Sequence, residues 1–146
     1  MLTYGQNQYR RTQVNTVDRG RLIILLYEGA ISFLSKAQHS IQEDDIAGAS
    51  VLINRAQDII DELNAALNME LGGDIAQNLR RLYMFMNDQL VQAKIKADLN
   101  PLKEVVRMLS SLNDAWREAV TKPEAQEVLS KQVQRPLAQT INNVTI

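Results

Sequence analysis

Hydrophobic residues recur at helical spacing along four stretches of the chain, with polar residues between them. In the first stretch, about 21–42, and the second, which ends near residue 68, apolar side chains repeat at alternating intervals of three and four. This spacing places them on one face of an α-helix. The predicted core positions of these two helices are Ile23, Leu26, Ala30, Phe33, Ala37, Ala49, Ile53, Ala56, Ile60, Leu63 and Leu67.

The third and fourth stretches continue the same rhythm up to Pro123 and are bounded by residues that start helices. Asp45 is a suitable N-cap for the second helix and Asp74 for the third, because a short carboxylate accepts hydrogen bonds from the first turn. Pro101, which follows Asn100, suits the first turn of the fourth helix. The predicted core positions here are Ile75, Leu79, Leu82, Met86, Leu90, Ala93, Leu102, Val105, Leu109, Leu112, Trp116 and Ala119.

Four helices of about 20 residues, each ~30 Å long, joined by short connections, favour antiparallel neighbours. The pattern therefore predicts an all-α fold, an antiparallel up-down four-helix bundle over residues 21–120. Residues 1–20 are predicted to form a short N-terminal arm or helix, and residues 121–146 a mobile C-terminal tail with one short helix at most. An array of short helical repeats is the alternative, but the sequence has no internal self-similarity that would support it.

Composition narrows the classes of function. The chain has 146 residues, the size of one domain, with no Cys, one His and a formal net charge of −1. These values exclude disulfides, thiolate chemistry and sites with several histidines, and they disfavour binding to nucleic acid. No apolar run is long enough to insert into a membrane, and the N-terminus lacks the pattern of a signal peptide. A cytoplasmic location is the simplest interpretation.

No residue pattern indicates catalysis, a metal site or a cofactor. His39 lies among polar residues, so we expect it to face solvent. The acidic run Glu43-Asp44-Asp45 suits a capped, solvated turn. Gly72-Gly73 lacks the Lys-Ser or Lys-Thr pair of a phosphate-binding loop. The sequence therefore predicts a protein that is not an enzyme.

The unusual feature is an excess of apolar side chains beyond the core positions. The first helix has a second stripe next to the core one, the second helix has a weaker version of it, and Met84 shares its predicted helix face with polar residues. Two interpretations remain open: a central helix buries both stripes between two neighbours, or the stripes accept an amphipathic helix from another protein. The candidate partner-binding residues are Tyr9, Ile24, Tyr27, Ile31, Leu34, Leu52, Ile59, Tyr83 and Met84.

Short motifs in order along residues 9–120 resemble the FliS family, the cytoplasmic chaperones of flagellin export. Two departures stand out: Thr16-Val17-Asp18-Arg19 lacks the proline that the family commonly has before the first long helix, and Met84 replaces an Asp. The segments that carry the resemblance are Tyr9–Thr16, Leu25–Ala30, Ala56–Leu63, Leu67–Glu70, Gly72–Leu79, Leu82–Tyr83, Ala93–Asp98 and Asp114–Ala119.

The resemblance implies a function that the residue pattern alone only permits. Family members bind the disordered C-terminal segment of flagellin, prevent its premature polymerisation and help deliver it to a component of the export gate. The resemblance also implies that Tyr9, in the arm, either covers the binding surface or contacts the export machinery. The alternative is a self-associating or adaptor bundle, such as a homodimer, with no flagellin client.

Overall fold

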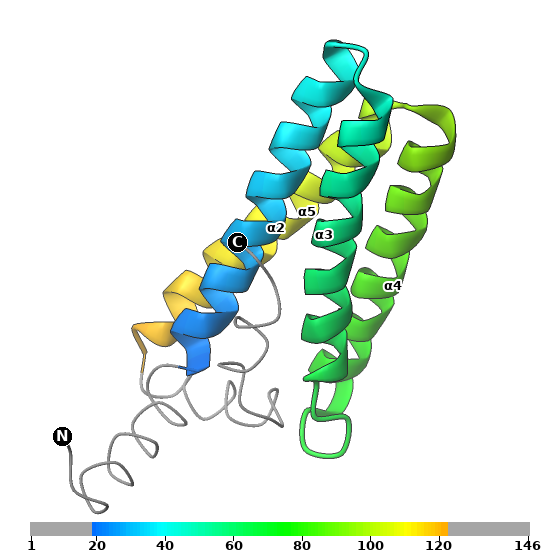
Figure 1. Ribbon diagram of the computed structural model, residues 1–146. Helices are drawn as coiled ribbons and strands as arrows, with labels where there is room; N and C mark the ends of the chain where they lie inside the picture. The colour runs from blue at the N-terminus through cyan, green and yellow to red at the C-terminus, as the bar shows by residue number, and fades with distance from the viewer. Residues whose placement is uncertain (1–18, 123–146) are drawn as a thin grey trace, which may run out of the picture.

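The computed structural model describes residues 19–122, which fold into four α-helices and no strand (Figure 1). The helices are α2 (Arg19–Gln42), α3 (Ile46–Ala65), α4 (Gly73–Lys96) and α5 (Leu99–Val120). Each runs antiparallel to the one before it, which confirms the predicted all-α up-down bundle. The predictions for the N-terminal arm and the C-terminal tail fall almost entirely outside the described residues.

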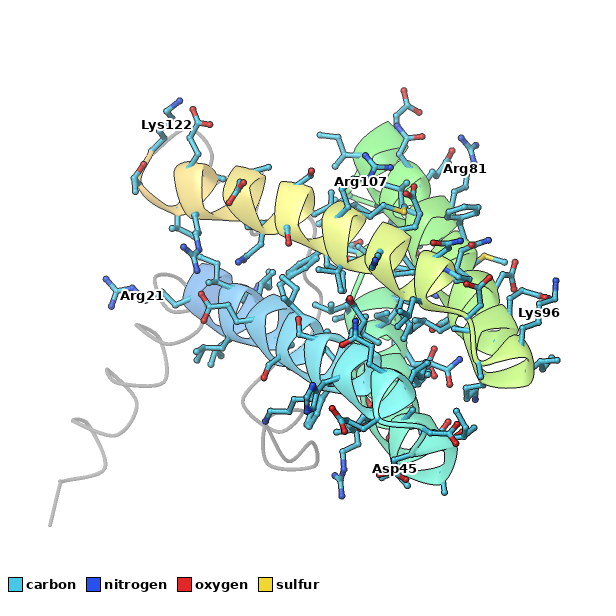
Figure 2. The ribbon with its side chains drawn as sticks, turned by 90° about the horizontal axis from the view of Figure 1, so that it is seen from above. Arg21, Asp45, Arg81, Lys96, Arg107 and Lys122 are labelled. Atoms are coloured by element: carbon cyan, nitrogen blue, oxygen red, sulfur yellow. The ribbon has the colours of Figure 1, made fainter. Side chains whose placement is uncertain are left out.

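The packing order of the helices sets which faces are covered. Helices α3 and α4 stand side by side, while α2 and α5 are tilted against them and run next to each other (Figures 1 and 2). Helix α2 packs against α3 and α5, and α4 packs against the same two helices. Helices α2 and α4 therefore occupy opposite corners of the bundle, and their outer faces point in different directions.

Two of the predicted helix starts are confirmed. The Asp45 carboxylate accepts a hydrogen bond from the backbone N–H of Gly48 at 3.0 Å, which satisfies one of the free donors of the first turn of α3. A Cβ atom at Gly48 would come within 2.2 Å of that carboxylate, so a larger residue there would displace the capping side chain. At the start of α5, Asp98 is the N-cap and Pro101 lies in the first turn, where a missing N–H costs no helical hydrogen bond.

The predicted cap of α4 is wrong. Gly72 is the N-cap and the helix begins at Gly73, so Asp74 lies inside the first turn. Gly73 has a φ of +56°, which is the left-handed region that favours glycine, and the chain turns there, one residue before Asp74. The carboxylate of Asp74 is thus placed near the positive end of the helix dipole but does not cap it.

The core lies along the bundle axis and matches the predicted positions on α2 and α3, all of which are buried. On α4 four predicted positions are buried, namely Leu79, Met86, Leu90 and Ala93. The other two are not: Ile75 is 51% exposed and Leu82 half-buried, and the next residues, Ala76 and Tyr83, are buried instead. On α5, Leu112, Trp116 and Ala119 are only half-buried and pack at the margin of the core.

Candidate partner-binding faces

The candidate residues occupy three different environments. Tyr9 lies outside the described residues. Ile24, Ile31 and Leu52 are half-buried, and Met84 is 57% exposed, as expected from the polar residues around it. The other four are fully or almost fully buried: Tyr27, Leu34, Ile59 and Tyr83.

The expectation of an open second stripe on α2 is therefore corrected for Tyr27 and Leu34. Helix α2 packs against both α3 and α5, so both of its stripes meet a neighbour. This is the interpretation in which a central helix buries both stripes. Ile59 and Tyr83 belong to the same hydrophobic core, and none of the four presents a surface to a partner.

The two buried tyrosines form a polar link across the bundle. The hydroxyl groups of Tyr27 on α2 and Tyr83 on α4 lie 2.5 Å apart, and their ring centroids are 6.5 Å apart. Trp116 on α5 also interacts with the Tyr27 hydroxyl and lowers its pKa slightly. The hydrogen bond between the two hydroxyl groups connects α2 to α4 inside an otherwise apolar core.

Burial keeps both hydroxyl groups neutral at ordinary pH. Desolvation raises the pKa of Tyr27 from 10.0 to about 12, although its hydrogen bonds with Tyr83 and Trp116 oppose that rise. Desolvation, followed by the proximity of Tyr27, raises the pKa of Tyr83 well above its usual range. A neutral hydroxyl both donates and accepts, so the pair satisfies itself without water.

The α2–α5 edge, defined here by Ile24, Glu28 and Ile31, combines apolar and charged groups. These residues share a helix face because they are four and three residues apart. Arg117 of α5 forms an ion pair with Glu28, which ties the two helices together between the isoleucines. Asn113 of α5 is 5% exposed, and its Oδ1 atom has no hydrogen-bond partner.

Exposed apolar side chains are concentrated on α4, where the sequence pattern predicted only Met84 to be exposed. Helix α2 has only Leu25 in this class and α3 has Ile46 and Val51. Those on α4 are Ile75, Met84, Phe85, Val91 and Ile95. The sequence contains a signal that could have predicted this exposed face. Val91 and Ile95 follow Met84 by seven and eleven residues, which places all three on one face of the helix.

Over residues 19–122 the structure has no cluster of three or more His, Cys, Asp or Glu side chains that could hold a metal ion. His39 is exposed, as expected. Within that range no helix has both the length and the apolar character needed to cross a bilayer.

Comparison with known proteins identifies the family. Residues 2–123 match the family model described as flagellar protein FliS. The chain belongs to the FliS family. The resemblance drawn from short motifs is thereby confirmed over most of the sequence.

Curated relatives in this family cover most of the chain. The flagellar secretion chaperone FliS of Bacillus subtilis is 35% identical over 112 residues, which is 77% of this chain and 83% of that protein. The FliS of Salmonella typhimurium is 36% identical over 73% of this chain and 80% of its own length. A crystal structure described as a flagellar chaperone from bacteria superposes with a TM-score of 0.69 at 21% identity, covering 80% of this chain and 98% of that one. This likeness supports the helical bundle fold.

Proposed function

We propose that this protein is a cytoplasmic export chaperone that holds the C-terminal segment of flagellin, prevents its premature polymerisation and helps deliver it to the flagellar export gate. Its FliS relatives are named flagellar secretion chaperones, which supports a chaperone role in flagellar export. The proposal includes no catalytic step, metal or cofactor.

The observation that supports client binding is a row of apolar side chains beside a completed core. The side chains of Tyr27 and Leu34 on α2 are buried in the bundle core. Ile24 and Ile31 on the same helix are only half-buried, at the α2–α5 edge. Leu52 is half-covered on α3 in the same way. An amphipathic helix could bury these side chains further, and its own apolar face would leave water at the same time.

Several modest contacts suit a client that is disordered until bound. Ordering such a segment costs conformational entropy, so a long interface of small contributions is expected instead of one deep pocket. Tyr9 remains a proposed contact from the N-terminal arm. Met84 remains a proposed partner contact too, but it lies on the outer face of α4, at the opposite corner of the bundle from α2.

Calorimetry with a peptide comprising the last ~40–60 residues of flagellin from the same organism tests the proposal. We expect binding by the full chain, and we expect Ile24→Asp to weaken it at least about tenfold, because a carboxylate would be buried against the client. Leu25→Asp is the matched control, since Leu25 is exposed on the same helix but lies outside the predicted set. Thermal unfolding of both variants checks that the bundle persists.

Two outcomes contradict the proposal. One is the absence of binding by the folded wild-type chain at about 100 µM, a concentration at which even weak specific binding is detected. The other is a tight dimer, seen by light scattering, that the flagellin peptide does not dissociate. That second result would favour the self-associating bundle.

A further inference from the structure

The outer face of α4 has an apolar row that the core does not use. The α4 row consists of Met84, Val91 and Ile95, which are 57%, 40% and 73% exposed. At 3.6 residues per turn, separations of seven and four residues keep these side chains within a narrow strip about 17 Å long. That length matches three turns of a helix laid along α4.

Positively charged side chains flank the α4 row on both sides. Arg80 and Lys94 lie on the side that faces α3, because both donate hydrogen bonds to α3 residues. By helical spacing, Arg81 and Lys96 lie on the other side of the row, and Figure 2 shows both on the outer side of α4. Asp88 is the one carboxylate adjacent to the row.

Neutral amide oxygens, and not carboxylates, hold three of these cations in place. Arg80 Nε donates to Asn64 Oδ1 at 3.3 Å, and Arg81 donates to Asn78 Oδ1 at 3.2 Å. Lys94 Nζ donates to the side-chain oxygens of Asn54 and Gln57, each at 2.9 Å. Such bonds fix the direction of a side chain but leave its charge uncompensated.

The carboxylate of Asp61, on the α3 side of this seam, does not pair with any of the four cations. Asp61 Oδ1 instead accepts from the Asn87 amide at 2.8 Å. None of the ion pairs between residues of the range 19–122 involves an α4 cation. By contrast, Arg107 and Arg117 of α5 pair with Glu104 and Glu28. The positive potential along the α4 row is therefore available to an incoming group.

The chain itself offers no complementary segment. Residues 1–18 contain two arginines and one Asp, and residues 123–146 contain two Glu, one Lys and one Arg, so neither is acidic. A second copy that docked α4 against α4 would bring like charges together, which is destabilising. A bilayer surface would need a wider apolar face with more bulky side chains than this three-residue row.

We propose that the α4 row is a docking surface for an acidic amphipathic helix from another protein. The apolar side of that helix covers Met84, Val91 and Ile95, and its carboxylates on either side meet Arg80 and Lys94 or Arg81 and Lys96. A basic residue of the partner meets Asp88. Because Arg80, Arg81 and Lys94 are already held by hydrogen bonds within the bundle, little of their side-chain entropy is lost on binding.

A designed peptide tests this surface without flagellin, so its result is independent of the proposed function. The probe is a helix of about 18 residues with Leu spaced to match the α4 row, Glu on both flanks and one central Lys. Its matched partner has the flanking Glu replaced by Lys. We expect the acidic peptide to bind the full chain at least about tenfold tighter in ~50 mM salt, and to lose most of that difference near ~500 mM salt.

Two pairs of variants locate the site. The double variant Arg81→Glu/Lys96→Glu should weaken binding of the acidic peptide at least about tenfold, whereas Lys103→Glu/Arg107→Glu on α5 changes the net charge equally and should have an effect below about twofold. Met84→Asp should abolish measurable binding, while Val51→Asp, at a similarly exposed site on α3, should not. Circular dichroism verifies that each variant is folded.

Three results would overturn the proposal. The first is equal binding of the acidic and basic peptides. The second is an equal loss of affinity in the α4 and α5 double variants, because that would show attraction to net charge alone. The third is binding to vesicles rich in anionic lipid that exceeds binding to the acidic peptide and is lost in Arg81→Glu/Lys96→Glu.

Discussion

Helices α2 and α4 are both 24 residues long and occupy opposite corners of the bundle, but they use their apolar residues differently. Nine residues of α2 are buried, against six of α4. Helix α2 leaves partly covered isoleucines at its edge and one exposed leucine, Leu25. Helix α4 leaves an exposed row, Met84, Val91 and Ile95, outside the bundle. An apolar excess in the sequence therefore does not by itself indicate a binding surface.

The two helices also differ in how their charges are treated. At the α2–α5 edge, Glu28 and Arg117 neutralise each other. Along the α3–α4 seam, Arg80 and Lys94 are held by neutral amides. The α2–α5 edge is thus close to neutral, whereas the α4 row is flanked by positive charges that no carboxylate within residues 19–122 pairs with.

The largest expected difference concerns stability. Leu34→Ala on α2 should lower the free energy of unfolding by about 2–5 kcal/mol, because it leaves a cavity in the core, whereas Met84→Ala on α4 should change it by less than about 0.5 kcal/mol. Urea denaturation of the two variants measures both values. Similar values for the two would contradict the division into a packed helix and an exposed row.

The tyrosine link between the two helices should give a pH dependence. In the folded protein the pKa of Tyr27 is raised to about 12. The neutral Tyr27 hydroxyl therefore makes its full contribution to the free energy of unfolding below pH 10, and this contribution is lost as the pH rises from about 10 to about 12. The free energy of unfolding of the wild type should fall by up to about 1.4 kcal/mol per pH unit for each tyrosine in this interval. The double variant Tyr27→Phe/Tyr83→Phe should show a flatter profile in denaturation series from pH 9 to 12, and an unchanged slope would refute the assignment.

Replacing Asn113, beside the α2–α5 edge, should change the stability by a smaller amount and should increase it. Its buried Oδ1 atom has no partner, so Asn113→Leu should raise the free energy of unfolding by about 1 kcal/mol. Thermal and urea unfolding measure the change. A loss of stability would show that the amide group has a structural partner in solution, such as a bound water molecule.

The smallest effect concerns the ion pair at the same edge. Glu28→Gln should cost less than about 1 kcal/mol, because both partners are half exposed to solvent, and the difference from wild type should disappear in ~1 M salt. For comparison, Lys94→Met on the other side of the bundle removes a cation that has no opposite charge beside it. The effect of Lys94→Met on the free energy of unfolding should therefore not shrink as the salt concentration rises.

Much of the fold could be predicted from local features. The helix spans came within a few residues because capping side chains, Pro101 and the spacing of apolar residues act over one or two turns. The prediction was wrong at Asp74, where a glycine with positive φ moved the start of α4. The exposure of Met84 also followed from its polar neighbours in the helical pattern.

The sequence by itself determined the four helices and the core positions on α2 and α3, because these depend on the local spacing of apolar residues. It also determined the family, because the family's motifs occur in order along the chain. Only the tertiary structure decided that Tyr83 replaces Leu82 in the buried stripe of α4. It also decided that α2 buries Tyr27 and Leu34 of its second stripe but only half covers Ile24 and Ile31, and that Lys94 meets amides and not carboxylates. The physical reason is the same in each case: which of two adjacent helix faces is buried, and which charges meet, depends on the neighbours and register of a helix and not on its own periodicity.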